Sequence, residues 1–236
     1  DAAGRWRWVS VGRPTAQTNT QKMADGVAPG RREWLLYLPL YNGVTSVEIG
    51  VPAGKTIEKA PAYPQTHAKP IVFYGTSITH GACATRPGMV HTAILSRKYG
   101  RPIINLGFSG NGRMEPEVTA LLAELDASVY VIDCCPNLTG PETSERTKPL
   151  VQQLRQARPN VPIVLVEDRV YTDAWLITSK KARNDGNHAA LKKSFDDLIA
   201  AGTKDLYYIP GSDLLGDDNE GAVDSSHPND QIGRAS

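Results

Sequence analysis

The stretch that decides the fold is IVFYGTSITHG, which occupies residues 71–81. Its first four residues are apolar and include β-branched and aromatic side chains, a pattern typical of a buried strand. Gly75, Thr76 and Ser77 follow at once. A serine just beyond the end of a strand lies where open parallel sheets place their sites, which makes Ser77 a candidate nucleophile. The same tripeptide is also typical of a turn followed by a helix N-cap, so this stretch alone leaves both interpretations open.

Downstream of residue 70, short apolar segments alternate with segments of helical spacing. The predicted strands are 71–74, 103–106, 129–133, 163–166 and 206–209, and the predicted helices are 89–99, 115–125, 145–157 and 180–201. Short apolar strands separated by helices are typical of a parallel sheet covered on both faces. The sequence therefore predicts a three-layer α/β/α, flavodoxin-like fold with about five parallel strands, whose chemistry gathers beyond the carboxyl ends of the strands.

The first 65 residues have a different pattern. Polar and apolar residues alternate over residues 5–11, 33–38 and 45–51, with Gly, Pro and Asn between them. This period of two predicts a β-rich segment, too small for a complete sandwich and hence a partial one. Residues 55–69 contain two prolines, Pro61 and Pro64, and are expected to form a linker. We expect a β-rich module over residues 1–65 and a second domain over residues 66–236.

Composition excludes several classes of function. The 236 residues suit one domain, or one domain with a small appendage. With 26 basic and 25 acidic residues, the chain offers no electrostatic surface for nucleic acid or an anionic membrane. No apolar run is long enough to span a membrane. The chain starts with Asp1, from which we expect a processed or trimmed product. The three cysteines, Cys83, Cys134 and Cys135, include no CxxC pair and do not indicate a disulfide framework.

The loop after the second predicted strand, GFSGNG at residues 107–112, is rich in glycine. Its order, G-x-x-G-x-G, differs from the G-x-G-x-x-G of dinucleotide sites, and this loop does not contain the GK[ST] of a P-loop. A flexible turn is one interpretation. The other is an oxyanion hole, because Asn111 supplies an amide donor beside backbone N–H groups.

After the fifth predicted strand comes DSSHPN at residues 224–229. A histidine three residues after an aspartate can take a proton from a serine while the carboxylate orients its ring, so Asp224 and His227 join Ser77 as candidates. A surface loop and a metal site are the alternatives. A catalytic metal is not expected, since none of the other histidines stands at HxxxH or HExxH spacing. These histidines are His67, His80, His91 and His188. His80 is too near Ser77 in sequence to be the better base.

Taken together, these motifs resemble the SGNH hydrolases, also called GDSL esterases, over about residues 69–229. That family has a GDS-like block, a glycine block, a GxN block and a late DxxH block, which correspond here to residues 75–77, Gly107, residues 110–111 and residues 224–227. The runs FYGTSIT, INLGFSGNGRMEPEV, VEDR and HPND are similar to a subgroup in which a small β-sandwich precedes the hydrolase domain. The chain departs from the pattern at Thr76, where the family usually has Asp.

The resemblance implies a cofactor-free serine esterase. In it Ser77 is the nucleophile, His227 the base and Asp224 the residue that orients it. The N–H groups of Ser77 and Gly107 and the side-chain amide of Asn111 then form the oxyanion hole. Family analogy also favours a secreted or periplasmic location. The expected partner is a small-molecule or glycan ester, with no nucleic acid and no membrane; the oligomeric state is not predicted.

The sequence says less about the substrate than about the catalytic residues. Because similar β-sandwich modules accompany sugar esterases, we expect short-chain, in particular acetyl, esters of a carbohydrate. Acyl transfer by the same residues is one alternative. A non-catalytic carbohydrate-binding protein is another, with Trp6, Trp8 and Trp34 as a platform. Arg169 and Asn137 are candidate substrate contacts, although an ion pair of Arg169 with a neighbouring acid is the favoured interpretation and Asn137 equally suits a turn cap.

Overall fold

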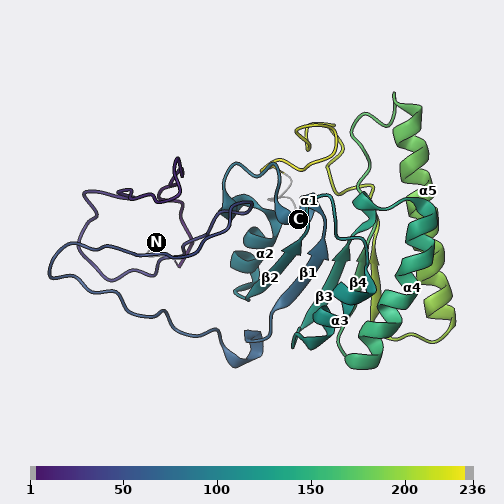
Figure 1. Ribbon diagram of the computed structural model, residues 1–236, viewed down its shortest axis with the longest axis horizontal. Coiled ribbons are helices and arrows are strands. Elements are labelled where there is room, and N and C mark those ends of the chain that lie inside the picture. Colours follow the sequence, from purple (N-terminus) through teal and green to yellow (C-terminus); the bar gives the residue numbers. More distant parts are fainter. Residues whose placement is uncertain (1–3, 232–236) are drawn as a thin grey trace. The chain divides into compact units, whose positions relative to one another are not determined.

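The computed structural model describes residues 4–231 and contains one parallel sheet of five strands. The strands are β1 Ile71–Gly75, β2 Ile103–Gly107, β3 Val129–Asp133, β4 Ile163–Val166 and β5 Leu206–Ile209. Their order across the sheet is β2-β1-β3-β4-β5 (Figure 1). The predicted α/β fold with a parallel five-stranded sheet is confirmed, and each strand lies within one residue of its expected bounds.

Helices connect consecutive strands. They are α1 Ser77–His80, α2 His91–Tyr99, α3 Pro116–Glu124, α4 Gly140–Ala157 and α5 Thr178–Ala200, with single 3-10 turns η1 Gln65–His67, η2 Pro87–Met89 and η3 Cys135–Asn137. Helix α4 begins five residues before the expected start. Thr139 and Glu142 form a reciprocal capping box there, which satisfies the first backbone N–H groups and fixes the helix start.

Successive side chains of the strands point to opposite faces of the sheet, and on each face they pack in an apolar layer. Even-numbered residues of β1 and β3, such as Val72 and Tyr130, enter the larger core with residues of α3, α4 and α5. Their odd-numbered neighbours, such as Phe73 and Val131, enter a smaller cluster that includes Leu95 of α2. Figure 1 shows α4 and α5 on one side of the strands and α2 on the other. This burial of both faces explains why the strands are apolar throughout.

The register brings the strand ends together at one edge. Gly75, the last residue of β1, lies opposite Gly107 of β2 and Asp133 of β3. A Cβ atom on Gly107 would lie 2.1 Å from the backbone nitrogen of His80, so only glycine allows α1 to pack so closely. The residues that follow these three strands therefore share one edge of the sheet, where α1 begins.

The N-terminal segment differs from expectation. The structure assigns no strand or helix to residues 4–64, so the β-strands expected at 5–11, 33–38 and 45–51 are not formed there. Their apolar side chains are exposed, with Trp8 63% and Ile49 61% accessible. An alternating segment is stable as a strand only when a neighbour satisfies its backbone and covers its apolar face, and the described residues supply neither.

The chain divides into two compact units. One comprises the residues up to Tyr37 together with Gly50–Ala60, and the other comprises Leu38–Ile49 together with the residues from Pro61 onward. The sheet lies entirely in the second unit. The predicted domain boundary at residue 65 stays a prediction. Among the described residues, no helix combines the length and apolar character that crossing a membrane requires.

Candidate active site

Ser77 is the first residue of α1, placed there by a tight turn out of β1. Thr76 is the N-cap, and its side-chain oxygen accepts a hydrogen bond from the Ile78 N–H at 3.2 Å. Gly75 permits the turn, because a Cβ atom there would lie 2.1 Å from Thr79 Oγ1. The strand end and the helix start together hold the Ser77 hydroxyl at the edge of the sheet, partly accessible to solvent.

The Ser77 hydroxyl is hydrogen-bonded to the ring of His227, 150 residues away in sequence, with Oγ 2.8 Å from Nε2. On the other side of the ring, His227 Nδ1 lies 2.7 Å from Asp224 Oδ2. The structure thus brings together the three side chains named from the sequence, in the order hydroxyl, imidazole, carboxylate. Such a chain can move the serine proton to the ring while the carboxylate stabilises the imidazolium that forms.

Asp224 is surrounded by donors. Partial burial raises the pKa of its carboxyl group, but hydrogen bonds from the backbone and ring of His227 and from the Ser226 N–H outweigh this and hold the pKa below its ordinary value. The backbone bonds measure 2.8 Å from His227 N and 3.1 Å from Ser226 N. Asp224 is therefore ionised at neutral pH and available as an acceptor for the ring.

The loop that carries Asp224 and His227 is tied to the domain at several points. Ser225, which has a positive φ of 68°, accepts the Thr172 N–H at 3.1 Å and its hydroxyl accepts from Lys180 Nζ at 2.8 Å. Further along, the Asp230 carboxylate accepts the Thr85 N–H at 3.0 Å. These contacts fix the base against both the segment after α1 and the segment after β4.

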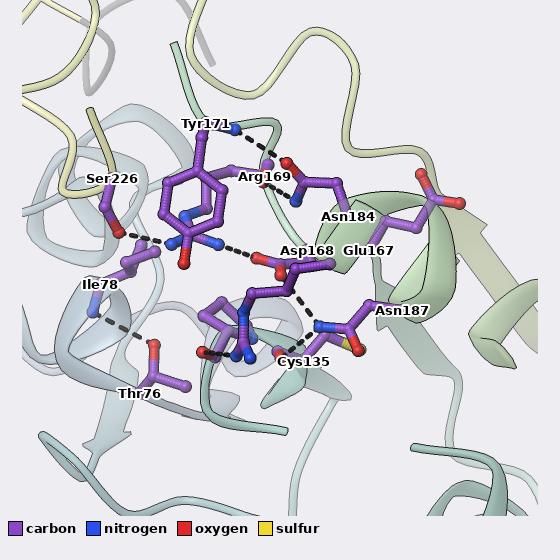
Figure 2. A network of polar contacts seen from close by, with 12 residues as sticks. Thr76, Ile78, Cys135, Glu167, Asp168, Arg169, Tyr171, Asn184, Asn187 and Ser226 are labelled. Carbon is purple, nitrogen blue, oxygen red and sulfur yellow. Dashed lines mark hydrogen bonds and ion pairs between the residues drawn. The ribbon is translucent and has the colours of Figure 1, made fainter. Parts of the chain in front are cut away.

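Arg169 lies beneath this loop in a buried polar network (Figure 2). Its guanidinium pairs with the fully buried Asp168, donates to Ser226 Oγ at 2.5 Å and stacks 3.8 Å from the centre of the Tyr171 ring. Asn187 donates to the other Asp168 oxygen at 3.0 Å. With 4% of its surface accessible, Arg169 is a structural support for the residue next to His227, as the favoured ion-pair interpretation expects.

A second carboxyl group, that of Asp133, lies beneath α1. Thr79 Oγ1 donates to Asp133 Oδ2 at 2.8 Å. Burial is the main cause that raises the pKa of Asp133 to about 7, and the neighbouring Asp168 adds to it, while Thr79 and Arg169 oppose it. Asp133 therefore changes charge near neutral pH while being in contact with the helix that starts at the nucleophile.

His80, considered from the sequence as a rival base, has a different role. Its Nε2 is bonded to the Leu40 carbonyl, and its ring stacks on Tyr41 with centroids 3.9 Å apart. Both ring contacts lie within the same compact unit as the sheet. His80 thus anchors the segment around Leu40 to α1.

On the oxyanion side, the structure differs from the expectation for Gly107. The Gly107 N–H donates to the side-chain Oδ1 of Asn105 at 2.9 Å. Asn105 also donates from Nδ2 to the Thr79 carbonyl at 2.7 Å, so its amide connects β2 to α1. The Gly107 N–H consequently already has an acceptor inside the fold and is not free to donate a hydrogen bond to a substrate oxygen.

The neighbouring loop offers free donors instead. Phe108 N donates to the Gly75 carbonyl at 2.9 Å, and Gly112 packs so closely that a Cβ atom would lie 2.0 Å from the same oxygen. Residues 108–112 are therefore held against the peptide that leads into Ser77. Within the part of the chain described, the N–H groups of Ser77 and Gly110 donate no hydrogen bond. An unsatisfied N–H in a glycine loop is the signal that sequence spacing alone did not reveal.

Two asparagine amides flank this loop. Asn111 is exposed, with a weak bond from Nδ2 to the Ser109 carbonyl at 3.5 Å. Asn137, in η3 after β3, directs its Nδ2 to the Asn111 carbonyl, and its own carbonyl accepts from Arg113 Nε at 2.9 Å. The structure thus brings Asn137 to the loop 108–112, which contains Asn111, at the same edge of the sheet.

Comparison with known proteins identifies the family. The model of the GDSL-like lipase/acylhydrolase family matches residues 68–235, and a model of the N-terminus of SGNH-hydrolase-type esterases matches residues 1–57. A search of curated proteins found no significant match.

Solved structures share the fold. A GDSL-like lipase from Bacteroides ovatus is 39% identical, with a TM-score of 0.68, over 70% of this chain and 49% of its own. The salicylyl-acyltransferase SsfX3 of a tetracycline biosynthetic pathway is 22% identical, with a TM-score of 0.60, over 72% and 52%. A family two carbohydrate esterase from Clostridium thermocellum, in complex with cellohexaose, is 16% identical, with a TM-score of 0.56, over 75% and 63%. The chain spans about half the length of the first two structures. On the match to residues 68–235, the chain belongs to the GDSL-like lipase/acylhydrolase family.

Proposed function

We propose that the chain hydrolyses carboxylic esters through a serine acyl-enzyme. The observation that carries the proposal is the hydrogen-bonded sequence of Ser77, His227 and Asp224, with separations of 2.8 and 2.7 Å. A serine is a weak nucleophile unless a base takes its proton, and a histidine oriented by a carboxylate is such a base. Membership of an acylhydrolase family supports the same chemistry.

In the first half of the reaction, His227 Nε2 takes the hydroxyl proton as Ser77 Oγ attacks the ester carbonyl. The ring, now an imidazolium, is stabilised by the ionised Asp224. When the tetrahedral intermediate collapses, His227 returns the proton to the departing alcohol and an acyl group remains on Ser77. In the second half a water molecule repeats the attack, with His227 again as the base, and the free acid leaves.

The negative oxygen of the intermediate needs donors aimed at it. We assign this role to the N–H groups of Ser77 and Gly110, which donate to no partner among residues 4–231, together with the side-chain amide of Asn137. Asn137 is favoured over Asn111 because its Nδ2 already points at the glycine loop, where a substrate oxygen would replace the Asn111 carbonyl as acceptor. Removing one such donor commonly lowers the rate by about 10²–10³-fold.

For the substrate we retain short-chain esters, in particular acetyl esters, of a carbohydrate. The partly open site supports a small acyl group and a large alcohol, since the Asp224 side chain is 52% exposed and the His227 side chain 26%. The fold itself does not select the acceptor, because an acyltransferase and a carbohydrate esterase both have it. Acyl transfer to an alcohol is therefore the second candidate, and product analysis with and without added alcohol separates the two.

The test is an esterase assay with p-nitrophenyl esters of increasing chain length and with acetylated sugars, comparing the parent with Ser77→Ala. The matched control is Ser109→Ala, since Ser109 lies in the adjacent loop and its hydroxyl makes no hydrogen bond in the described structure. We expect Ser77→Ala to abolish turnover and Ser109→Ala to retain it. Equal rates for Ser77→Ala and the parent would contradict the proposal, and glycan binding without turnover by the parent would favour a binding protein.

A further inference from the structure

A thiol lies beside the histidine and carboxylate of the site and takes no part in the proposed reaction. Cys83, Asp224 and His227 each direct one atom able to bind a metal into a common space, and these three atoms lie within 4.8 Å of one another. Cys83 belongs to the segment directly after α1, while the other two residues come from the late loop. Three ligand atoms of different chemistry thus converge from two distant parts of the sequence.

We propose that Cys83, Asp224 and His227 form a binding site for a zinc ion, and that its occupation switches the esterase off. Thiolate, imidazole and carboxylate are the three groups that bind zinc in proteins, and three protein ligands with a fourth position for water are typical of an accessible site. All three side chains are at least partly accessible, so the ion can enter with water as its remaining ligand. The inhibitory effect rests on the proposed function, whereas the binding site does not.

The two ligand-bearing segments are held in place before any ion arrives. The Thr85 N–H donates to Asp230 Oδ1 at 3.0 Å, and the Thr85 hydroxyl donates to the other oxygen at 2.5 Å. Thr85 is two residues from Cys83, and Asp230 is three residues from His227. This bidentate link fixes the spacing of the ligands, so binding requires little ordering of the chain.

The electrostatics of the site favour a cation. The Asp224 carboxylate supplies a negative charge beside the thiol of Cys83 and the ring of His227. On binding, the thiol releases its proton to solvent and the sulfur forms a bond to the ion as thiolate.

Zinc on either nitrogen of His227 prevents the reaction. If the ion binds Nε2, it occupies the atom that receives the Ser77 proton. If it binds Nδ1, it replaces the hydrogen bond to Asp224, and the remaining ring proton moves to Nε2, which then no longer accepts a proton. Both cases remove the base while leaving Ser77 and the sheet unchanged. The site is consequently inhibitory and distinct from a catalytic metal centre.

The experiment measures binding and activity separately on the full chain after dialysis against a chelator. Cobalt(II) is the spectroscopic probe, since thiolate ligation gives a sulfur-to-cobalt charge-transfer absorption in the near ultraviolet, and zinc is added as competitor and as inhibitor. The variants are Cys83→Ser, Ser77→Ala and the control His67→Gln, a histidine bonded to Gly100 at a distance from the site. Cys134 and Cys135 are fully buried in the core and do not contribute to the absorption.

We expect the absorption in the parent, in Ser77→Ala and in His67→Gln, and its loss in Cys83→Ser. Zinc should inhibit the parent and His67→Gln reversibly. Its affinity should fall at least about tenfold in Cys83→Ser, because even supporting residues around a metal ligand are worth 10–100-fold. Equal zinc inhibition of the parent and Cys83→Ser, or a parent without the absorption, would overturn the inference. An inactive parent that shows the absorption would refute the proposed esterase and leave the metal site standing.

Discussion

The pair formed by Asp168 and Arg169 allows a sharp test of how the site is supported. Asp168 has no accessible surface and Arg169 has 4%, so each charge depends on the other and on fixed hydrogen bonds. Replacing Arg169 with Met leaves an uncompensated carboxylate in the interior. Breaking one side of a buried pair costs about 3–5 kcal/mol, a large part of the roughly 5–15 kcal/mol by which a domain is stable.

The assay is urea unfolding of the parent, Arg169→Met, Asp168→Asn and the double variant, followed by circular dichroism. Each single variant should lower the midpoint without changing the slope, since the surface exposed on unfolding stays the same. The double variant should lose less than the two single losses together, because neither charge is then left unpaired, and a coupling of about 0.5–3 kcal/mol is usual for groups in contact.

Ser226→Ala serves as the matched control. It removes the hydroxyl that accepts from Arg169 at 2.5 Å and leaves the buried pair intact. We expect it to cost only about 1 kcal/mol of unfolding free energy, the usual net worth of one hydrogen bond. A loss below about 1 kcal/mol for Arg169→Met, or strictly additive single losses, would refute the argument that the network depends on mutual charge compensation.

Three further outcomes are expected. Gly107→Ala places a methyl group 2.1 Å from a backbone nitrogen of α1, so we expect it to lower the unfolding free energy by about 1–3 kcal/mol and to remove most activity. Gly186→Ala is the matched control, because Gly186 lies in the middle of α5 and a Cβ atom there has nothing within 4 Å. We expect this control to raise the unfolding free energy by about 0.5–1 kcal/mol in thermal unfolding. Asn137→Ala should lower kcat about 10²–10³-fold with little change in KM, and Asn111→Ala much less; the reverse order would exchange their roles. Because the folded-state pKa of Asp133 is raised to about 7, the folded chain keeps this proton to a higher pH than the unfolded chain does. The unfolding free energy should therefore fall as the pH rises from about 4 to 7, by up to roughly 1 kcal/mol per pH unit. Asp133→Asn should flatten that slope, and an unchanged slope would exclude Asp133 as its cause.

The sheet could be predicted from the sequence because both of its faces are buried. Five apolar segments such as 71–74 and 129–133 have few alternatives to strands when helices separate them. The start of α4 was placed too late, since the prediction followed apolar spacing and overlooked the capping pattern of Thr139 and Glu142. The alternating segments near Trp8 and Ile49 were overinterpreted as strands. Alternation indicates what a strand would bury, but it does not supply the partner strand.

For the site, the sequence indicated which loops meet, because the carboxyl ends of parallel strands share an edge. That argument led to Ser77 and to His227, 150 positions apart. It failed for Gly107, whose N–H is taken by the side chain of Asn105 two residues earlier. Competition of this kind depends on rotamers and on the packing of β2 against α1. The free N–H of Gly110 becomes visible only when every backbone donor has been accounted for.

The separation of Ser77 from His227 has a consequence for the timing of synthesis. A ribosome adds about 5–20 residues per second, so roughly 8–30 s pass between the appearance of the two side chains. During that interval the strands β2 to β5 are synthesised and can assemble with β1, while the serine hydroxyl lacks the imidazole that would activate it. Ser77 therefore has no base until the loop at residues 224–227 has been synthesised and has packed against α1, and the proposed esterase activity cannot begin before that point.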